Sequence, residues 1–492
     1  MNAIFMIIAI AIPLVGGVLI SAFKKTDNLK LMHVFTEIVV VITSILVFAI
    51  LLNKPAGVFE LVHFSNDLSI CFKIDGLGTV FTAMVAFLWP FATLYSFEYM
   101  KHEGKEYSFF MFYTMTYGVT LGIAMSGNML TMYCFYEMLT LVTLPLVMHT
   151  GSREAILATR KYLYYSLGGA AFAFIGMIFL IVYGTANTFN YGGVIDMALV
   201  GNRAQILRLI YVFAFMGFSV KAAMFPFHGW LPDAGVAPTP VTALLHAVAV
   251  VKSGAFATMR LTYYCFGTDF LRGTWAQYVI MGFIVFTIVF GCSMAVKETH
   301  LKRRLAYSTI SNLSYILFGV SIMTPLGLIG ALSHMVFHAF MKILSFLCAG
   351  SVIVGSGKKY VHELDGMGRK MPQIFTLFTI SSLALMGVPG LCGFISKWNL
   401  ATAAFASGNR LAYLGVVALL ISALLTGIYM MTIVFRAWIP GKDFDYSTLE
   451  GIKDPTWRML IPLYVFAIGC VVFGLCSPMV VDFFAQIAAG LI

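Results

Sequence analysis

Several basic side chains in this sequence lie inside apolar stretches. Lys221 ends one apolar run, and His246 and Lys252 lie in the run that follows it. Histidine gains and loses a proton near neutral pH, and burial lowers the proton affinity of a lysine toward the same range. A row of such groups could therefore pass protons from one to the next.

A second set of basic residues is evenly spaced in the stretch SHMVFHAFMKILSF. His334, His338 and Lys342 recur every four residues, so on a helix each is rotated by about 40° from the last and the three rise about 12 Å along one face. This spacing predicts a polar stripe on an apolar helix. Two histidines four residues apart could also bind a metal ion, but no nearby cysteine or carboxylate completes a site, so we expect none here.

Two acidic residues share this apolar setting. Glu137 lies in NMLTMYCFYEMLTLVTLPL, and a lysine on a neighbouring helix is its expected partner. The simpler alternative for Glu137 is a static ion pair that only holds two helices together. Glu37, in HVFTEIVVVITSI, is more ambiguous, and we favour a structural or interfacial role for it.

The apolar surroundings of these lysines are energetically unfavourable for an ionised side chain. An ionised group at the centre of a bilayer costs about 2.5 to 3.5 kcal/mol, so Lys221, Lys252, Lys342 and Lys397 should face a wet or paired interior. His246 and Lys252 are six residues apart, or about 120° around an α-helix. We therefore expect these two side chains to face different neighbouring helices.

The composition places these residues in a membrane. Of the 492 residues 60% are apolar and only 11% are charged, and the mean hydropathy is +0.91. A membrane-spanning helix needs about 20 apolar residues. We count fourteen such runs, at 3–22, 31–52, 77–100, 109–126, 128–148, 162–184, 206–226, 239–262, 276–296, 304–323, 326–354, 372–406, 411–436 and 458–486. They predict an all-α polytopic membrane protein with about 14 transmembrane helices.

The distribution of charge predicts an orientation. With the N-terminus outside and fourteen spans, twenty lysines and arginines fall in cytoplasmic loops and six on the opposite side, as the preference of basic loops for the cytoplasm requires. Both termini should then lie outside the plasma membrane of a prokaryotic cell. We read the net charge of +10 as this orientation signal and expect no nucleic-acid partner. Arg260 lies near the end of its run, where it could reach the membrane surface.

Proline and glycine predict two broken helices. Pro226 follows Lys221, and Pro389 and Gly390 precede Lys397 within a single apolar run. Freed backbone groups at membrane depth survive only inside protein or beside water. Paired breaks are typical of transporters with inverted repeats, and two ordinary proline kinks are the alternative.

These stretches resemble a known family. FPFHGWLPDAGVAPTPVTALLHAVAVVKSGAF, HMVFHAFMKILSFLCAG, HELDGMGRKMP and GLCGFISKW resemble the antiporter-like membrane subunits shared by respiratory complex I, the membrane-bound hydrogenases and formate hydrogenlyases, and the Mrp-type cation/proton antiporters. The resemblance covers roughly residues 75 to 440. It implies two inverted five-helix repeats, each with a discontinuous helix, and a division into N-terminal helices at 1–106, repeats at 107–264 and 275–438, and a last helix at 456–492.

The resemblance also implies roles for the residues singled out above. Glu137 would pair with Lys221 in one half-channel, with the basic Lys161 close after it in the sequence. Lys397 would be the lysine of the other half-channel. The residues of the relay that connects the two would be His246, Lys252, His334, His338 and Lys342.

The implied function is proton translocation, or exchange of protons for sodium, by one subunit of a multi-subunit energy-converting redox complex of the hydrogenase or complex I kind. The chain would carry no cofactor, because it has no C-x-x-C pair and no glycine-rich phosphate loop. Its partners would be other membrane subunits, including antiporter-like paralogues, and a soluble redox arm. An Mrp-type subunit without a redox partner and an independent solute carrier are the alternatives.

Overall fold

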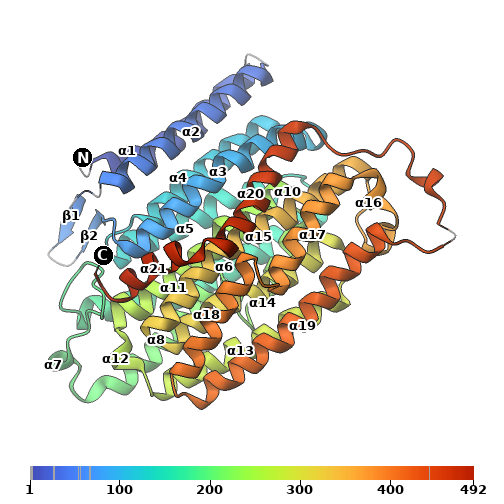
Figure 1. The fold of residues 1–492 in the computed structure, drawn as a ribbon. Helices are drawn as coiled ribbons and strands as arrows, with labels where there is room; N and C mark the ends of the chain where they lie inside the picture. The colour runs from blue at the N-terminus through green and yellow to red at the C-terminus, as the bar shows by residue number, and fades with distance from the viewer. Residues whose placement is uncertain are drawn as a thin grey trace.

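The computed structural model describes residues 4–25, 28–53, 55, 57–65, 68–442 and 444–491. Most of these residues lie in helices that run side by side in one bundle (Figure 1). Twelve helices within the described ranges are long and apolar enough to cross a membrane. The protein is therefore an all-α polytopic membrane protein, as its composition predicts.

The helices of the bundle are, in chain order, α1 (Ile4–Ile20), α2 (Leu29–Asn53), α3 (Gly76–Glu103), α4 (Glu106–Ala124), α5 (Met129–Val147), α6 (Arg153–Tyr183), α8 (Ala204–Ser219), α11 (Val250–Met259), α13 (Trp275–Lys297), α14 (Leu301–Ile322), α15 (Pro325–Ser356), α17 (Pro372–Met386), α18 (Cys392–Ala406), α19 (Arg410–Trp438), α20 (Trp457–Leu475) and α21 (Ser477–Ala488). Shorter elements join them: η1 (Ser21–Lys25), α7 (Met197–Val200), η2 (Gly201–Arg203), α9 (Trp230–Asp233), η3 (Ala234–Val236), α10 (Thr239–Ala243), η4 (Leu244–Val248), η5 (Arg260–Phe266), α12 (Thr268–Leu271), η6 (Val361–Glu363), α16 (Met367–Lys370) and η7 (Tyr446–Leu449). Of these, η4 and η5 are π-helical turns and the other η elements are 3₁₀ turns.

Each of the twelve membrane-spanning helices overlaps a different one of the fourteen expected runs. The expected run at 109–126 is helix α4, which is 19 residues long. The expected run at 372–406 forms two shorter helices, α17 and α18, with a turn between them. Polar residues start several helices, because their side chains accept hydrogen bonds from free backbone N–H groups: Asn128 before α5, Ser152 before α6 and Thr324 before α15.

Both predicted helix breaks are present. Helix α8 ends at Ser219, and the chain passes through turns around Pro226 before α9 begins. Helix α17 ends at Met386, and α18 begins at Cys392 after a turn that contains Pro389 and Gly390. The two breaks follow the proline and glycine positions in the sequence.

Three spans form the centre of the bundle. The most apolar 18 residues of Thr239–Phe266 are all buried inside the protein, and for Leu301–Ile322 and Pro325–Ser356 the buried shares of the corresponding 18 residues are 94% and 89%. In the other spans, except α3, half or fewer of the most apolar 18 residues are buried, so these spans present apolar side chains to lipid. Polar groups on the three central spans therefore lie inside protein, away from the acyl chains.

The described strands form one hairpin. β1 (Phe59–Ser65) pairs antiparallel with β2 (Leu68–Phe72), with Phe59 opposite Phe72. The side chain of Asn128 donates a hydrogen bond to the main-chain oxygen of Ser69 over 2.8 Å, which ties the hairpin to the start of α5. The hairpin therefore belongs to one end of the bundle.

Arg260 is fully buried, which corrects the expectation that it reaches the membrane surface. Its guanidinium donates two hydrogen bonds to the carboxylate of Asp75, the residue that caps α3. Burial raises the pKa of Asp75, but the charge and hydrogen bonds of Arg260 more than offset this, so the pKa lies below its usual value. The pair holds the start of α3 against η5.

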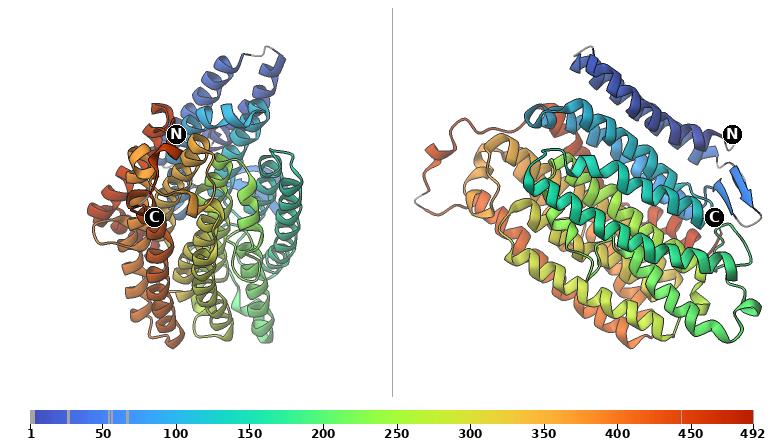
Figure 2. Two further views of the ribbon diagram at one scale, coloured as in Figure 1. Left: turned by 90° about the vertical axis from the view of Figure 1, so that its right-hand side faces the viewer. Right: turned by 180° about the vertical axis from the view of Figure 1, so that it is seen from behind.

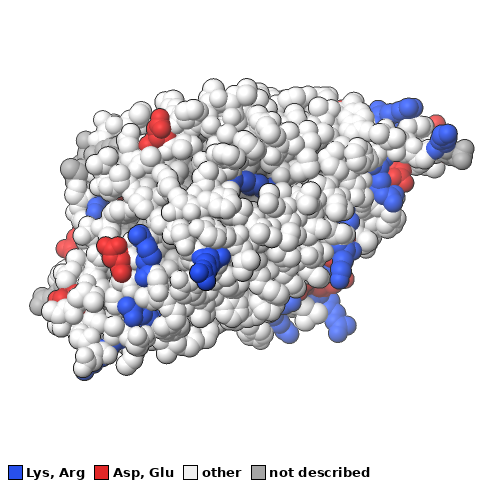
Figure 3. Space-filling view, turned by 60° about the horizontal axis from the view of Figure 1, so that its bottom comes forward, with Lys and Arg blue, Asp and Glu red and all other residues white. Residues whose placement is uncertain are grey.

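The two chain ends lie at the same end of the bundle, beside the hairpin (Figures 1 and 2). The loop between α19 and α20 lies at the opposite end. Other basic loops meet there too, because the N–H of Leu301 donates to Lys359 O and the N–H of Gly366 donates to Arg436 O. On the face shown in Figure 3 most of the surface is uncharged; basic side chains lie at this loop end, and others lie beside acidic ones toward the opposite end.

Candidate functional site

Lys221 lies in the first break and is only 1% exposed. Its ammonium donates a hydrogen bond to the main-chain oxygen of Tyr136 and lies 3.4 Å from the centre of the Tyr136 ring. The hydroxyl of Tyr136 in turn donates to Phe218 O over 3.0 Å. Helices α5 and α8 are thus held together around the buried ammonium.

Glu137 does not form the expected ion pair with Lys221. No distance of 4.0 Å or less joins the two charged groups, and Oε1 of Glu137 is buried without a hydrogen-bond partner among the described residues. The two groups still interact electrostatically. The ammonium of Lys221 instead contacts the carbonyl and the ring of Tyr136, the residue before Glu137, and these contacts account for the separation.

The helix that carries Lys252 packs directly against this break. A Cβ atom at Gly254 would lie 2.7 Å from the backbone nitrogen of Ala222, so only glycine allows such a close approach. The hydroxyls of Ser219 and Ser253 are buried here without partners among the described side chains. Lys221 and Lys252 therefore lie on adjoining segments with unsatisfied polar atoms close to both.

His246 and Lys252 both contact α15, which corrects the expectation that they face different helices. Nζ of Lys252 lies 2.8 Å from Nδ1 of His338, and the His246 ring lies 4.8 Å from the ring of Phe346. The expected angle of 120° assumed a regular α-helix. The chain instead forms the π turn η4 at His246, which changes the rotation between the two residues.

His334, His338 and Lys342 are all fully buried on α15. Nδ1 of His334 is 2.9 Å from Oγ of Ser396 on α18, and Nζ of Lys342 donates to Oγ of Ser308 on α14 over 2.7 Å. The rings of His334 and His338 lie 5.5 Å apart. The stripe thus reaches three surrounding segments, α11, α14 and α18.

Lys397 lies on α18, shortly after the second break, and its side chain reaches back to the break. Its ammonium donates to the main-chain oxygens of Leu385 and Met386 over 2.8 and 2.9 Å. These carbonyls belong to the last turn of α17, where a helix leaves its oxygens without partners. The ring of Tyr315 lies between this lysine and the stripe, 5.5 Å from Nζ of Lys397 and 5.0 Å from the ring of His334.

Lys161 lies apart from these buried groups. Its half-exposed ammonium forms an ion pair of 2.7 Å with Asp233 on α9, and Arg303 lies 3.8 Å from the same carboxylate. We define the central row as Lys221, His246, Lys252, His334, His338, Lys342 and Lys397, without Lys161; the first six side chains are buried and that of Lys397 is partly buried.

Several partners of the central row are neutral residues that the sequence analysis missed. They are Tyr136, Ser308, Tyr315 and Ser396. Tyr429 is connected to the row indirectly, because its hydroxyl donates to Ser308. One signal could have found two of them, because the stretch YSTISNLSY places Ser308 and Tyr315 among five further polar residues within a membrane span. No comparable signal marks Ser396 or Tyr429.

The central row carries more polar atoms than its contacts satisfy. Both ring nitrogens of His246, and Nε2 of His334 and of His338, are buried without hydrogen-bond partners in the described part of the chain. Buried polar atoms in proteins are almost always hydrogen-bonded to protein or to ordered water. These nitrogens therefore mark places for water, and a row of amines, imidazoles and water can move protons. No three His, Cys, Asp or Glu residues of the described ranges gather in a group that could hold a metal ion.

The chain is similar to known membrane proteins over almost its whole length. Residues 126–426 match the family described as NADH:quinone oxidoreductase/Mrp antiporter, TM, and residues 62–110 match the complex I chain 5 N-terminus. The chain is 31% identical over 430 residues to NADH-quinone oxidoreductase subunit N of Desulforudis audaxviator (strain MP104C), with 84% of each chain covered.

Two solved structures have a similar fold. One is a chain of the archaeal membrane-bound sulfane sulfur reductase, with a TM-score of 0.85 and 22% identity, and the other is a chain of the Mrp complex from Dietzia sp. DQ12-45-1b, with a TM-score of 0.84 and 20% identity. Each likeness covers 99% of this chain and 97% of the other. The match to the family over more than half of the chain, together with this relative, shows that the chain belongs to the NADH:quinone oxidoreductase/Mrp antiporter transmembrane family.

Proposed function

We propose that this chain is a proton-translocating, antiporter-like subunit of a larger membrane complex. The observation that carries the proposal is the central row, which runs from the first helix break through two of the three buried spans, Thr239–Phe266 and Pro325–Ser356, to the second break. Buried ionisable groups weaken a membrane protein unless they are paired or hydrated, so a fold does not gain stability from collecting them. Proton transfer explains why they lie in a row.

The contacts of the row suit proton transfer. A proton on the ammonium of Lys252 can pass to Nδ1 of His338 along the hydrogen bond of 2.8 Å that joins them. The gap between the His338 and His334 rings can be bridged by one water molecule. His334 then contacts Ser396, the neighbour of Lys397 in the sequence. Lys342 and His246 form a side branch, and both lie beside the ring of Phe346, at 6.0 Å from Nζ of Lys342 and 4.8 Å from the His246 ring.

Glu137 supplies a means of control. Its carboxylate acts on Lys221 through space, because Tyr136 keeps the two groups from direct contact. A carboxylate that approaches a lysine favours its charged form, and one that withdraws favours release of the proton. A small movement of α5 against the break would therefore load or unload Lys221.

We place the chain in a hetero-oligomeric complex, since its relatives are named as subunits of such complexes. A soluble redox arm, exchange of sodium for protons and the two inverted repeats at 107–264 and 275–438 are parts of this proposal. An independent solute carrier is disfavoured, because two surface cavities of about 750 and 490 Å³ are lined by side chains such as Leu424 and Phe435, or Phe87 and Phe340, and by no residue of the central row.

The test is proton uptake by vesicles that contain the intact complex. We expect Glu137→Gln and Lys221→Ala each to abolish coupled uptake, because one removes the controlling charge and the other removes the group it acts on. Matched controls are Glu154→Gln and Lys297→Ala, two exposed residues at helix ends, which should pump normally. Native gel electrophoresis would check that every variant assembles. Normal pumping by assembled Glu137→Gln and Lys221→Ala complexes would refute the proposal.

A further inference from the structure

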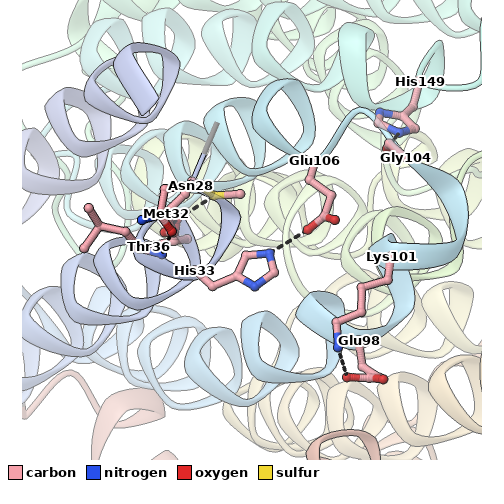
Figure 4. A network of polar contacts seen from close by, with 10 residues as sticks. Asn28, Met32, His33, Thr36, Glu98, Lys101, Gly104, Glu106 and His149 are labelled. Carbon is pink, nitrogen blue, oxygen red and sulfur yellow. Dashed lines mark hydrogen bonds and ion pairs between the residues drawn. The ribbon is translucent and has the colours of Figure 1, made fainter. Parts of the chain in front are cut away.

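A second group of polar residues lies between α2, α3 and α4, away from the central row. Nε2 of His33 on α2 is 2.5 Å from Oε2 of Glu106 at the start of α4 (Figure 4). The His33 and Glu106 side chains are only 13% and 8% exposed. The imidazole ring stacks on Phe97 and meets the edge of Phe110, so aromatic rings shield the pair.

The contacts between α2 and α4 continue deeper into the bundle. The hydroxyls of Ser44 and Tyr117 are 2.8 Å apart, and each residue lies eleven positions after its counterpart in the His33–Glu106 pair. Eleven residues of α-helix rise about 16 Å. The two polar contacts between α2 and α4 therefore lie at the two ends of a stretch of about that length. Glu37 lies within this stretch, one helical turn after His33, which places it on the same face of α2.

The stretch between the two contacts contains buried polar atoms without partners among the described residues. They are Oε2 of Glu37, the hydroxyl of Tyr113 and Nε1 of Trp89. Tyr113 interacts electrostatically with Glu37, and the Trp89 ring lies 5.4 Å from Tyr113 and stacks on Tyr117 at 4.8 Å. The three atoms therefore come from three helices and surround one region that calls for ordered water.

Among the side chains that the structure describes, no neighbouring element supplies a countercharge for Glu37. Helix α1 has no ionisable side chain, and Lys24 on η1 is exposed. On α3, Lys101 donates to Glu98 over 2.8 Å, and His102 and Glu103 are exposed at the helix end (Figure 4). On α4 the charged residue is Glu106, which is paired with His33.

We propose that His33, Glu106 and Glu37 form a proton-binding branch separate from the central row, with Glu37 as the buried acceptor. A static ion pair would be complete with His33 and Glu106 and would leave an acidic group one turn deeper unexplained. In the branch, the imidazolium of His33 gives its proton through ordered water to the carboxylate of Glu37. The neutral imidazole then takes another proton from solvent at the loop end, while Glu106 holds the ring in place.

This branch goes beyond the proposed function and its test does not need transport. Infrared difference spectra of the purified full-length chain in lipid, recorded between acidic and basic pH, report carboxylic acids that gain and lose a proton. We expect the wild type to show a carboxyl band from Glu37, and Glu37→Gln to lose that band while a contribution from the buried Glu137 would remain. Glu98→Gln is the matched control, because Glu98 lies at the same end but pairs outward with Lys101, and it should keep the band.

Two further variants keep the test decisive. Glu37→Asp retains the acid at the same position, so the band should move in frequency and remain. His33→Leu removes the group that delivers the proton, so the band should appear about 100-fold more slowly after a jump to acidic pH. A band that is unchanged in both Glu37→Gln and Glu37→Asp, or that appears at the wild-type rate without His33, would overturn the branch. Neither result depends on whether Glu137→Gln pumps protons.

Discussion

The hydroxyl of Ser308 contacts the central row at Lys342. Its oxygen accepts hydrogen bonds from Nζ of Lys342 and from the hydroxyl of Tyr429, each over 2.7 Å. A serine oxygen has two lone pairs, and both are used. The charge on Lys342 is therefore stabilised by a neutral residue that also fixes α19 against α14.

Replacing Ser308 by alanine should impair both stability and transport. Two buried donors would lose their acceptor, at a cost of about 1 to 3 kcal/mol for a group left unsatisfied. We expect a lower melting temperature and slower proton uptake in vesicles. Ser314→Ala is the matched control, because Ser314 is equally buried on α14 but donates only to Ile310 O of its own helix. Equal uptake rates in the two variants would show that Lys342 does not depend on Ser308.

The contrast between Ser308 and Ser314 shows how far the sequence predicts the site. Charged residues are conspicuous among apolar ones, so each lysine and histidine of the central row could be named from the sequence. The stretch YSTISNLSY marks a polar segment, but serines in membrane helices mostly bond to their own backbone, and nothing within the stretch distinguishes the serine that faces Lys342. The partner of Lys221 is a main-chain oxygen, and the sequence carries no sign of it.

At the scale of the element, the helix breaks could be predicted from the sequence, whereas the π turn could not. Pro226, Pro389 and Gly390 predicted where α8 and α17 would be interrupted, since proline and glycine act on the backbone directly. The π turn at Leu244–Val248 has no such residue within it. The expected orientation of His246 was wrong for that reason, because one wide turn rotates every side chain that follows.

The second break offers a test of how an element positions a lysine. Gly387 and Gly390 have φ angles of +93° and +91°, so an alanine at either position costs about 1 to 2 kcal/mol of backbone strain. A Cβ atom at Gly387 would lie 3.1 Å from Cδ of Lys397, whereas one at Gly390 would contact nothing. We expect both alanine variants to lose similar stability in thermal unfolding.

Only Gly387→Ala should also slow proton uptake, because the new methyl group displaces Lys397 from the carbonyls of Leu385 and Met386. Gly390→Ala serves as the control for backbone strain alone. If the two variants took up protons at the same rate, the position of Lys397 at the break would have no bearing on transport.

At the scale of the whole molecule, ion pairs and hydrogen bonds close the two ends differently. At the loop end, Asp233 meets Lys161 and Arg303, and basic loops from three parts of the chain lie together. At the hairpin end, Arg260 is buried against Asp75, and Arg272 donates to Met323 O. The loop end thus carries the exposed positive charge that the sequence assigns to the cytoplasm.

This arrangement predicts the orientation in the membrane. Basic loops stay in the cytoplasm, so the loop end should face inward, and the hairpin end with both termini should face outward. We expect alkaline phosphatase, which is active only outside the plasma membrane, to be active when fused after the last residue and inactive when inserted at Gly441 between α19 and α20. A fluorescent protein that folds only in the cytoplasm should give the opposite pattern. Because the C-terminal end of the chain and Gly441 lie at opposite ends of the bundle, activity of the phosphatase at both sites would mean a misinserted chain. A fully reversed pattern would mean that the positive charge does not set the orientation.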